Sequence, residues 1–126
     1  MLYTTLGKTN RKVSRIGFGG CPAGVKNYVE TYDPGKTDDY SEGVRAARRA
    51  YELGINYFDT APGYGNGLSE QIIGEALDGI PCENLFIATK VRYNEEPDVF
   101  KSLEGSLTRL RREHIDLLQL HGDYYT

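Results

Sequence analysis

The sequence predicts an α/β fold in which a β-hairpin is followed by four parallel strands and three helices. Short apolar runs of strand length alternate with longer segments of helical periodicity, and three of the runs end in an ionisable residue. Lys90 follows Asp59 by 31 residues and His121 follows Lys90 by 31, about the length of one strand–helix repeat. These equal intervals place the three side chains at the same end of a parallel sheet.

The first twenty residues contain the predicted hairpin and one short strand. Tyr3–Thr5 and Lys12–Ser14 are extended segments around Gly7-Lys-Thr-Asn10, which suits a tight turn. Arg15–Gly20 then has the pattern of a strand that ends in glycines. Such an ending permits close approach of a ligand or of another backbone, and it is equally typical of a plain turn.

A loop is predicted from Cys21 to Asp39, because prolines and glycines interrupt any periodicity there. Loops of this length tend to be binding loops or lids, or else to be disordered. Tyr28 and Tyr32 are candidates either to contact a ligand or to anchor the loop.

Three helices follow. The first spans Ser41–Leu53 and stops at Gly54. Its candidate capping residues are Asp38, Asp39 and Ser41. The second spans Glu70–Leu77, and the third lies between Pro97 and Arg111, with Pro97 in its first turn. The third helix has an apolar stripe of Phe100, Leu103, Leu107 and Leu110.

The apolar runs between these helices are predicted to be parallel strands that are buried on both faces. They comprise residues 54–58, 85–90 and 115–121. No helix follows the last strand, so the chain has the pattern of the first half of a larger sheet. Its outer edges, Arg15–Gly20 and Ile115–His121, are expected to favour self-association.

Composition narrows the class of protein. A chain of 126 residues can form one domain, and its net charge of −3 with scattered basic residues argues against a nucleic-acid partner. The first residues lack a secretory pattern and no apolar run approaches membrane-spanning length, which argues against a membrane partner. Cys21 and Cys82 have no metal-ligand spacing and form no disulfide framework, so we expect a reducing cytoplasm and no metal site.

Four residues are candidates for chemistry: Asp59, Tyr64, Lys90 and His121. Asp59 ends a strand, and Tyr64 stands between glycines five residues later, so neither is placed as a core residue would be. Each also has a structural interpretation: an Asp59–Lys90 ion pair, a packed tyrosine and a core histidine. Their coincidence at strand ends favours a site, whereas His114 precedes its strand and is interpreted as structural.

These motifs resemble the N-terminal half of an aldo-keto reductase. The segment Asp59-Thr-Ala-Pro-Gly-Tyr64-Gly matches the signature of that family, Ala-Thr-Lys90 its lysine strand, and Asp116-Leu-Leu-Gln-Leu-His121 its histidine strand. The match covers essentially the whole chain, in order and at the family's spacing. The segment Tyr64-Gly-Asn-Gly-Leu-Ser-Glu70 is most similar to the branch of sugar or galactose dehydrogenases.

The resemblance implies that residues 1–126 form strands 1–4 of an eight-stranded (β/α)8 barrel domain, which takes roughly 250 residues in full. It implies hydride transfer between NADP or NAD and an aldehyde, ketone or aldose, with the four candidates as a catalytic tetrad. The residues implied near the cofactor are Gly20, Cys21, Asp59 and Tyr64. Most other cofactor contacts of the family belong to its C-terminal half.

The residue types suit this chemistry. A phenol is a weak acid, and a neighbouring ammonium stabilises the phenolate, so Lys90 would make Tyr64 a usable proton donor and acceptor. Asp59 would hold Lys90 in place, and His121 would hydrogen-bond the substrate carbonyl. Because the chain resembles a truncated form, the alternative function is a non-catalytic half-barrel that acts as a binding or regulatory module.

Overall fold

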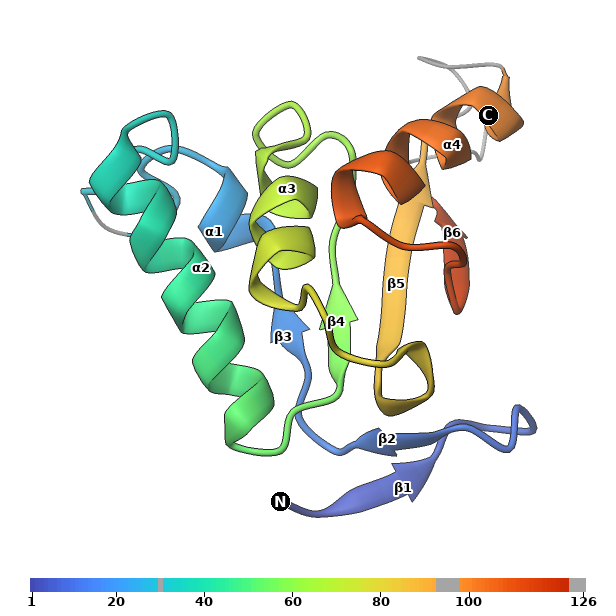
Figure 1. Ribbon diagram of the computed structural model, residues 1–126. Coiled ribbons are helices and arrows are strands. Elements are labelled where there is room, and N and C mark those ends of the chain that lie inside the picture. Colours follow the sequence, from blue (N-terminus) through green and yellow to red (C-terminus); the bar gives the residue numbers. More distant parts are fainter. Residues whose placement is uncertain (30, 93–97, 123–126) are drawn as a thin grey trace.

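The computed structural model describes residues 1–29, 31–92 and 98–122. The described residues form a parallel sheet with helices packed on one face and a hairpin across the amino-terminal end of the strands (Figure 1). This is the α/β half-barrel that the sequence predicts, with the hairpin first and the strands and helices alternating after it.

The sheet consists of four parallel strands in the order β3-β4-β5-β6 within the described residues. Their bounds are β3 Phe18–Gly19, β4 Tyr57–Asp59, β5 Phe86–Val91 and β6 Leu117–Leu120. The two outer strands are therefore the predicted ones. The strand predicted over Arg15–Gly20 is shorter than expected, because the Arg15 N–H instead donates to the Leu2 carbonyl of the hairpin at 2.9 Å.

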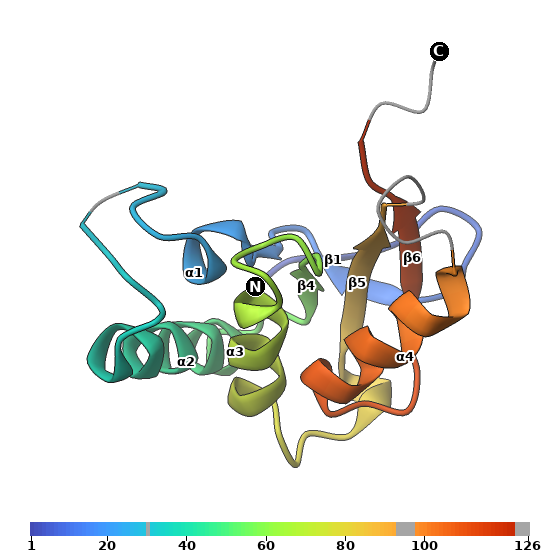
Figure 2. The same cartoon turned by 90° about the horizontal axis from the view of Figure 1, so that it is seen from above.

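Three helices connect these strands: α2 Thr37–Glu52, α3 Leu68–Ala76 and α4 Val99–Leu110. They lie side by side on the same face of the sheet (Figure 2), with a short 3-10 helix, η1 Cys82–Asn84, before β5. Gly54 follows α2 with φ of +96°, which is the left-handed conformation expected of a helix stop. Pro97 lies outside the described residues, and the carboxylate of Asp98 caps α4 by accepting the Lys101 N–H at 3.0 Å.

The predicted loop from Cys21 to Asp39 is partly wrong. It begins with a single helical turn, α1 Cys21–Gly24, and α2 already starts at Thr37. The predicted caps fail for a physical reason: the N-cap is Lys36, and the Asp39 carboxylate accepts the Asp33 N–H at 2.7 Å instead of capping the helix.

The core lies between the sheet and the helices. It is built by Phe58, Ile73, Leu77, Ile87 and Leu110 together with other buried aliphatic residues. The predicted stripe of α4 is wrong at Phe100, whose side chain is 79% exposed. The buried side of α4 is centred on Ser106 and Leu110, and at 3.6 residues per turn Phe100 lies about 100° around the helix from it.

Burial of the strands on both faces holds for β5 and fails for the other strands, including β4, where Phe58 is buried and its two neighbours are half-buried. Every residue of β5 except Lys90 is buried, whereas β6 is half-buried and its Leu120 is 67% exposed. β5 has a strand on each side, α4 on one face and the Arg11 guanidinium over Phe86 on the other. In the described residues β6 has a strand on one side alone, so its polar and apolar positions stay accessible.

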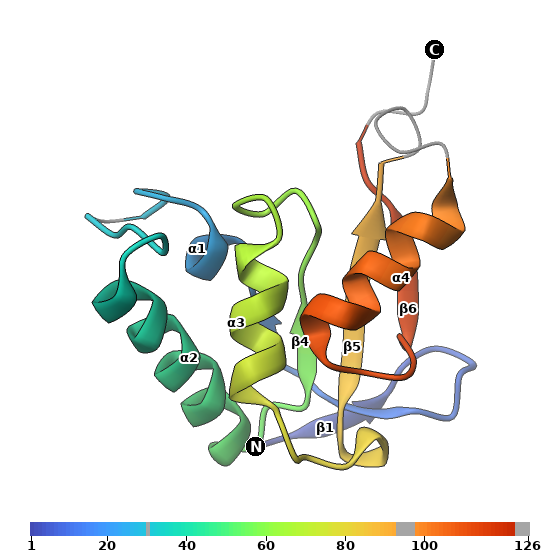
Figure 3. The same cartoon turned by 45° about the horizontal axis from the view of Figure 1, so that its top comes forward.

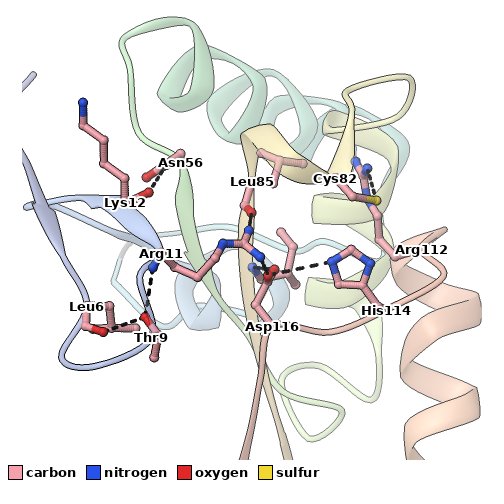
Figure 4. Close-up of polar contacts among 11 residues, drawn as sticks. Leu6, Thr9, Arg11, Lys12, Asn56, Cys82, Leu85, Arg112, His114 and Asp116 are labelled. Carbon is pink, nitrogen blue, oxygen red and sulfur yellow. Dashed lines mark hydrogen bonds and ion pairs between the residues drawn. The ribbon is translucent and has the colours of Figure 1, made fainter.

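The hairpin, β1 Tyr3–Thr5 and β2 Lys12–Ser14, pairs as predicted, with Gly7 and Asn10 of its turn at positive φ. Arg11 fastens it to the sheet (Figure 4): one guanidinium nitrogen lies 2.7 Å from Asp116 Oδ1, and the other donates to the Leu85 carbonyl at 2.7 Å. The buried Asp116 carboxylate also accepts the Ile87 N–H at 2.8 Å.

His114 belongs to this amino-terminal end of the sheet. Its Nε2 lies 3.8 Å from Asp116 Oδ1 (Figure 4). Half of its side chain is exposed. His114 therefore lies at the end of the sheet opposite the carboxyl ends of the strands, as its position before β6 predicts.

Candidate active site

Three parallel strands deliver Asp59, Lys90 and His121 to one edge of the sheet. Asp59 is the last residue of β4, Lys90 is next to last in β5, and His121 follows β6 with its N–H donating to the Val91 carbonyl at 2.9 Å. The loop from β4 to α3, which carries Tyr64, rises at this same end, opposite the hairpin (Figure 3). Residues that are equally spaced in the sequence thus lie together at the carboxyl ends of the strands.

Lys90 and Asp59 form a close ion pair. The Lys90 Nζ lies 2.5 Å from Asp59 Oδ1 and donates a second hydrogen bond to the Thr60 carbonyl at 2.8 Å. The side chains of Lys90 and Asp59 are 13% and 31% exposed, so the ammonium is mostly removed from water while the carboxylate keeps some access to it. Two acceptors fix the ammonium in position.

Tyr64 and His121 complete the cluster. The Lys90 Nζ lies 5.1 Å from the centre of the Tyr64 ring, within the range of a cation–π contact. The edge of one ring meets the face of the other between Tyr64 and His121, with 5.5 Å between ring centres. The structure therefore brings all four predicted site residues together.

A second tyrosine, Tyr57, lies two residues before Asp59 on the same strand. Burial and the Asp59 carboxylate raise the pKa of the Tyr57 phenol, with Lys90 acting in the opposite direction. Its ring stacks on Phe86 at 5.0 Å between centres. A raised pKa and a ring that packs on a neighbour are typical of a structural tyrosine.

The residues predicted near a cofactor occupy different environments. Gly20 is buried, its N–H donates to the Asp59 carbonyl at 2.7 Å, and a Cβ added to it would meet Ser69 Oγ at 2.4 Å. Cys21 begins α1 and is partly exposed. Gly20 therefore has a packing role in this chain, and its contact with a cofactor stays a prediction.

Tyr28 and Tyr32, the other aromatic candidates, belong to the segment between α1 and α2. Both line a cavity of about 500 Å³ together with Phe18 and residues of α2. The Tyr32 hydroxyl donates to the Ala23 carbonyl at 2.9 Å, so this side chain anchors the loop to α1. Burial and the nearby Asp39 and Glu42 carboxylates raise its pKa.

Sequence reasoning missed a group of buried polar side chains directly beneath the Tyr64 loop. Thr60, Ser69, Glu70 and Thr89 are each 0% exposed. None of the four has apolar neighbours on both sides, so no signal in the sequence marked them as buried. At the start of a helix, hydroxyl and carboxyl groups are more often read as solvent-facing caps.

With this geometry established, comparison with known proteins decides the family. The family model for the aldo/keto reductase family matches residues 15–126. The chain belongs to this family. The parallel strands and their helices are accordingly the N-terminal part of the barrel that the family shares.

Relatives of this aldo/keto reductase chain include an L-galactose dehydrogenase from Arabidopsis thaliana, 40% identical over 124 residues. That alignment covers 92% of this chain and 36% of the plant protein, and it agrees with the predicted resemblance to galactose dehydrogenases. The chain thus spans little more than a third of that relative's length.

Solved structures of similar fold also belong to aldo-keto reductases. An aldo-keto reductase from Bacillus halodurans in its holo form matches with a TM-score of 0.76 at 32% identity. An aldo-keto reductase from Klebsiella pneumoniae, solved in complex with NADPH, matches with a TM-score of 0.75 at 25% identity. Each match covers 98% of this chain and 41% of the other. No helix among the described residues is long and apolar enough to cross a membrane.

Proposed function

We propose that this chain carries the acid–base groups of an NAD(P)-dependent oxidoreductase that interconverts a carbonyl compound and an alcohol. The observation that carries the proposal is the Asp59–Lys90 pair at 2.5 Å with the ammonium 5.1 Å from the Tyr64 ring. The substrate class is an aldehyde, ketone or aldose. The similarity to an L-galactose dehydrogenase supports an aldose.

In the proposed reaction Tyr64 gives its phenolic proton to the carbonyl oxygen during reduction and recovers it during oxidation. Lys90 stabilises the phenolate that this transfer leaves, and Asp59 holds the ammonium in place. His121, in edge-to-face contact with Tyr64, donates a hydrogen bond to the same carbonyl oxygen. A bound nicotinamide supplies or accepts the hydride, which no side chain can do.

The residues present fit a nicotinamide. Gly19 pairs with Asp59 across β3 and β4, and a Cβ added at Gly19 or at Gly63 would meet no atom within 4 Å. Open backbone at these two glycines, beside a partly exposed Asp59 and a half-buried Tyr64, leaves room for a flat ring. The relative solved with NADPH supports NADP, and NAD stays an alternative.

Calorimetric titration of NADPH and NADH tests the proposal. We expect a protein that contains this chain in a barrel of its relatives' full length, called here the complete protein, to bind one of them at micromolar concentration. We also expect it to change nicotinamide absorbance when an aldose or aldehyde is added. The isolated 126-residue chain is expected to bind more weakly. Absence of binding of both nucleotides to the complete protein would contradict an oxidoreductase and favour the non-catalytic half-barrel.

We further propose that two copies of this chain associate through the sheet edges. In the described part of the chain, β3 and β6 each pair on one side, and Leu120 on β6 and Ile16 before β3 are 67% and 63% exposed. Exposed apolar side chains next to unpaired strand edges favour edge-to-edge contact. Light scattering on the purified chain at tens of micromolar should detect a dimer or larger species. A monodisperse monomer with a cooperative thermal melt would show this to be wrong.

A further inference from the structure

The first turn of α3 buries two adjacent polar side chains, Ser69 and Glu70, each with 0% of its surface exposed. A carboxylate so completely removed from water persists in a fold only where charge and hydrogen bonds compensate it. Both residues lie directly after the loop that carries Tyr64. The hydrogen-bond partners of Ser69 and Glu70 show which elements the two side chains connect.

Ser69 connects α3 to the ends of β3 and β4. Its hydroxyl donates to the Gly20 carbonyl at 2.8 Å and shares a hydrogen bond of 2.8 Å with Thr60 Oγ1. The carbonyl of the same Thr60 accepts from Lys90 Nζ at 2.8 Å. One residue, Thr60, therefore separates Ser69 from the ammonium of the site.

Glu70 connects α3 to β5 and to α4. Its Oε1 accepts the Thr89 hydroxyl at 2.6 Å, and its Oε2 accepts the Arg109 Nε at 2.6 Å. Thr89 immediately precedes Lys90, so this carboxylate reaches the strand that delivers the ammonium. The charge of Arg109, whose side chain is 28% exposed, compensates that of Glu70.

The same turn also holds the Tyr64 loop. The Ser69 N–H donates to the Tyr64 carbonyl at 3.2 Å. Between them Gly65, Asn66 and Gly67 all have positive φ, at 65°, 53° and 92°. A run of such residues is permissive, so its single conformation depends on the groups that anchor its ends.

From these contacts we infer that Ser69 and Glu70 are positioning residues, which set the place of Tyr64 relative to Lys90. The inference rests on the acid–base role proposed above for Tyr64. Neither residue touches the reacting atoms: Ser69 acts through the Tyr64 carbonyl and Thr60, and Glu70 acts through Thr89 and Arg109. Together they tie the Tyr64 loop to Thr60, which accepts from the Lys90 ammonium, and to Thr89 on the Lys90 strand itself.

Glu70→Gln is the sharpest test, because it keeps the shape of the side chain and removes its charge opposite Arg109. Hydrogen bonds to charged groups contribute more to stability than neutral ones do. Because this variant loses one, we expect hydrogen–deuterium exchange of the Ser69 amide to accelerate by about tenfold to a hundredfold. We expect kcat of the complete protein to fall by about tenfold to a hundredfold, with the KM for the nucleotide unchanged. Exchange in the hairpin should stay as it is.

Glu75→Gln is the matched control. Glu75 lies on the same helix and pairs at the surface with Arg111 at 3.6 Å, so its loss should change neither amide exchange at Ser69 nor kcat. Arg109→Lys preserves the positive charge and should recover part of the activity that Arg109→Gln loses. Ser69→Ala provides a second route to the same effect without altering any charge.

These measurements separate the positioning role from the proposed function. If Tyr64→Phe leaves turnover unchanged, the proposed function fails whatever Glu70→Gln does. If Tyr64→Phe abolishes turnover while Glu70→Gln and Ser69→Ala accelerate exchange uniformly along the chain and leave kcat intact, the positioning role is overturned. Should Glu70→Gln fail to fold, the comparison of Ser69→Ala and Arg109→Lys with wild type decides in the same way.

Discussion

Replacing Tyr64 with phenylalanine is expected to lower kcat of the complete protein by about a hundredfold to ten-thousandfold, the usual worth of a positioned acid–base group. The substitution removes a single oxygen and leaves the ring to contact Lys90 and His121, so the fold and the ion pair below it should persist. Steady-state kinetics in both reaction directions, with the nucleotide affinity measured in parallel, provide the check.

Tyr57→Phe is the control for this prediction. Tyr57 lies on β4, its pKa is raised by burial and by Asp59, and its ring packs on Phe86. Loss of this hydroxyl should change kcat by no more than a few-fold. If Tyr64→Phe retained turnover within a few-fold of wild type, Tyr64 would not be the proton donor.

The raised pKa of Tyr57 also fixes the direction of its pH effect. A folded-state pKa above that of the unfolded chain means that the contribution of Tyr57 to stability is complete below the ordinary phenol pKa. That contribution is lost as the pH rises through the folded-state pKa. Near neutral pH, where Tyr57→Phe serves as a control, that contribution is therefore fully present and does not change with pH.

The location of the site could be predicted from the sequence, because parallel strands all end at the same edge of a sheet. Once three strand-like runs end at intervals of 31 residues, a parallel register brings Asp59, Lys90 and His121 to one edge. Tyr64 was found for a different reason, since a bulky phenol between glycines after a strand has no core position to fill. Both inferences depend on local order along the chain.

The buried ion pairs could not be found in this way, because they join residues distant in sequence. Glu70 pairs with Arg109, 39 positions later, and Arg11 with Asp116. No local pattern marks either pair, and each residue alone is typical of a solvent-facing position. The burial of the Glu70 and Asp116 carboxylates appears only when the helices and the hairpin pack on the sheet.

The elements that were wrongly predicted have similar causes. One helical turn such as α1 is too short to produce a periodic pattern, and Pro22 near its start reads equally well as a loop residue. At the end of the stripe in α4, Phe100 has helical spacing to Leu103 and Leu107 but lies off the side that meets α3 and β5. Periodicity identifies a face, and the neighbouring elements decide how much of it is covered.

Replacing Gly65 with alanine should destabilise the fold by about 2–5 kcal/mol, through a left-handed backbone and a steric clash. The φ of Gly65 is +65°, and a Cβ there would lie 1.7 Å from the Gly24 carbonyl oxygen. Gly24 cannot retreat at low cost, because a Cβ on it would itself meet Ser69 N and Tyr64 O at 2.7 Å. Backbone faces backbone at this point, so no side chain can rotate to relieve the clash.

Urea denaturation measures this loss, and Gly63→Ala is its matched control in the same loop. Gly63 has no positive φ and open space where a Cβ would be, so the substitution should change the free energy of unfolding by no more than about 0.5 kcal/mol. Because Gly65 is adjacent to Tyr64, the folded fraction of Gly65→Ala should also lose turnover, whereas Gly63→Ala should retain its fold. Equal unfolding midpoints for the two variants would mean that α1 and the Tyr64 loop are not packed as closely as Gly24 and Gly65 require.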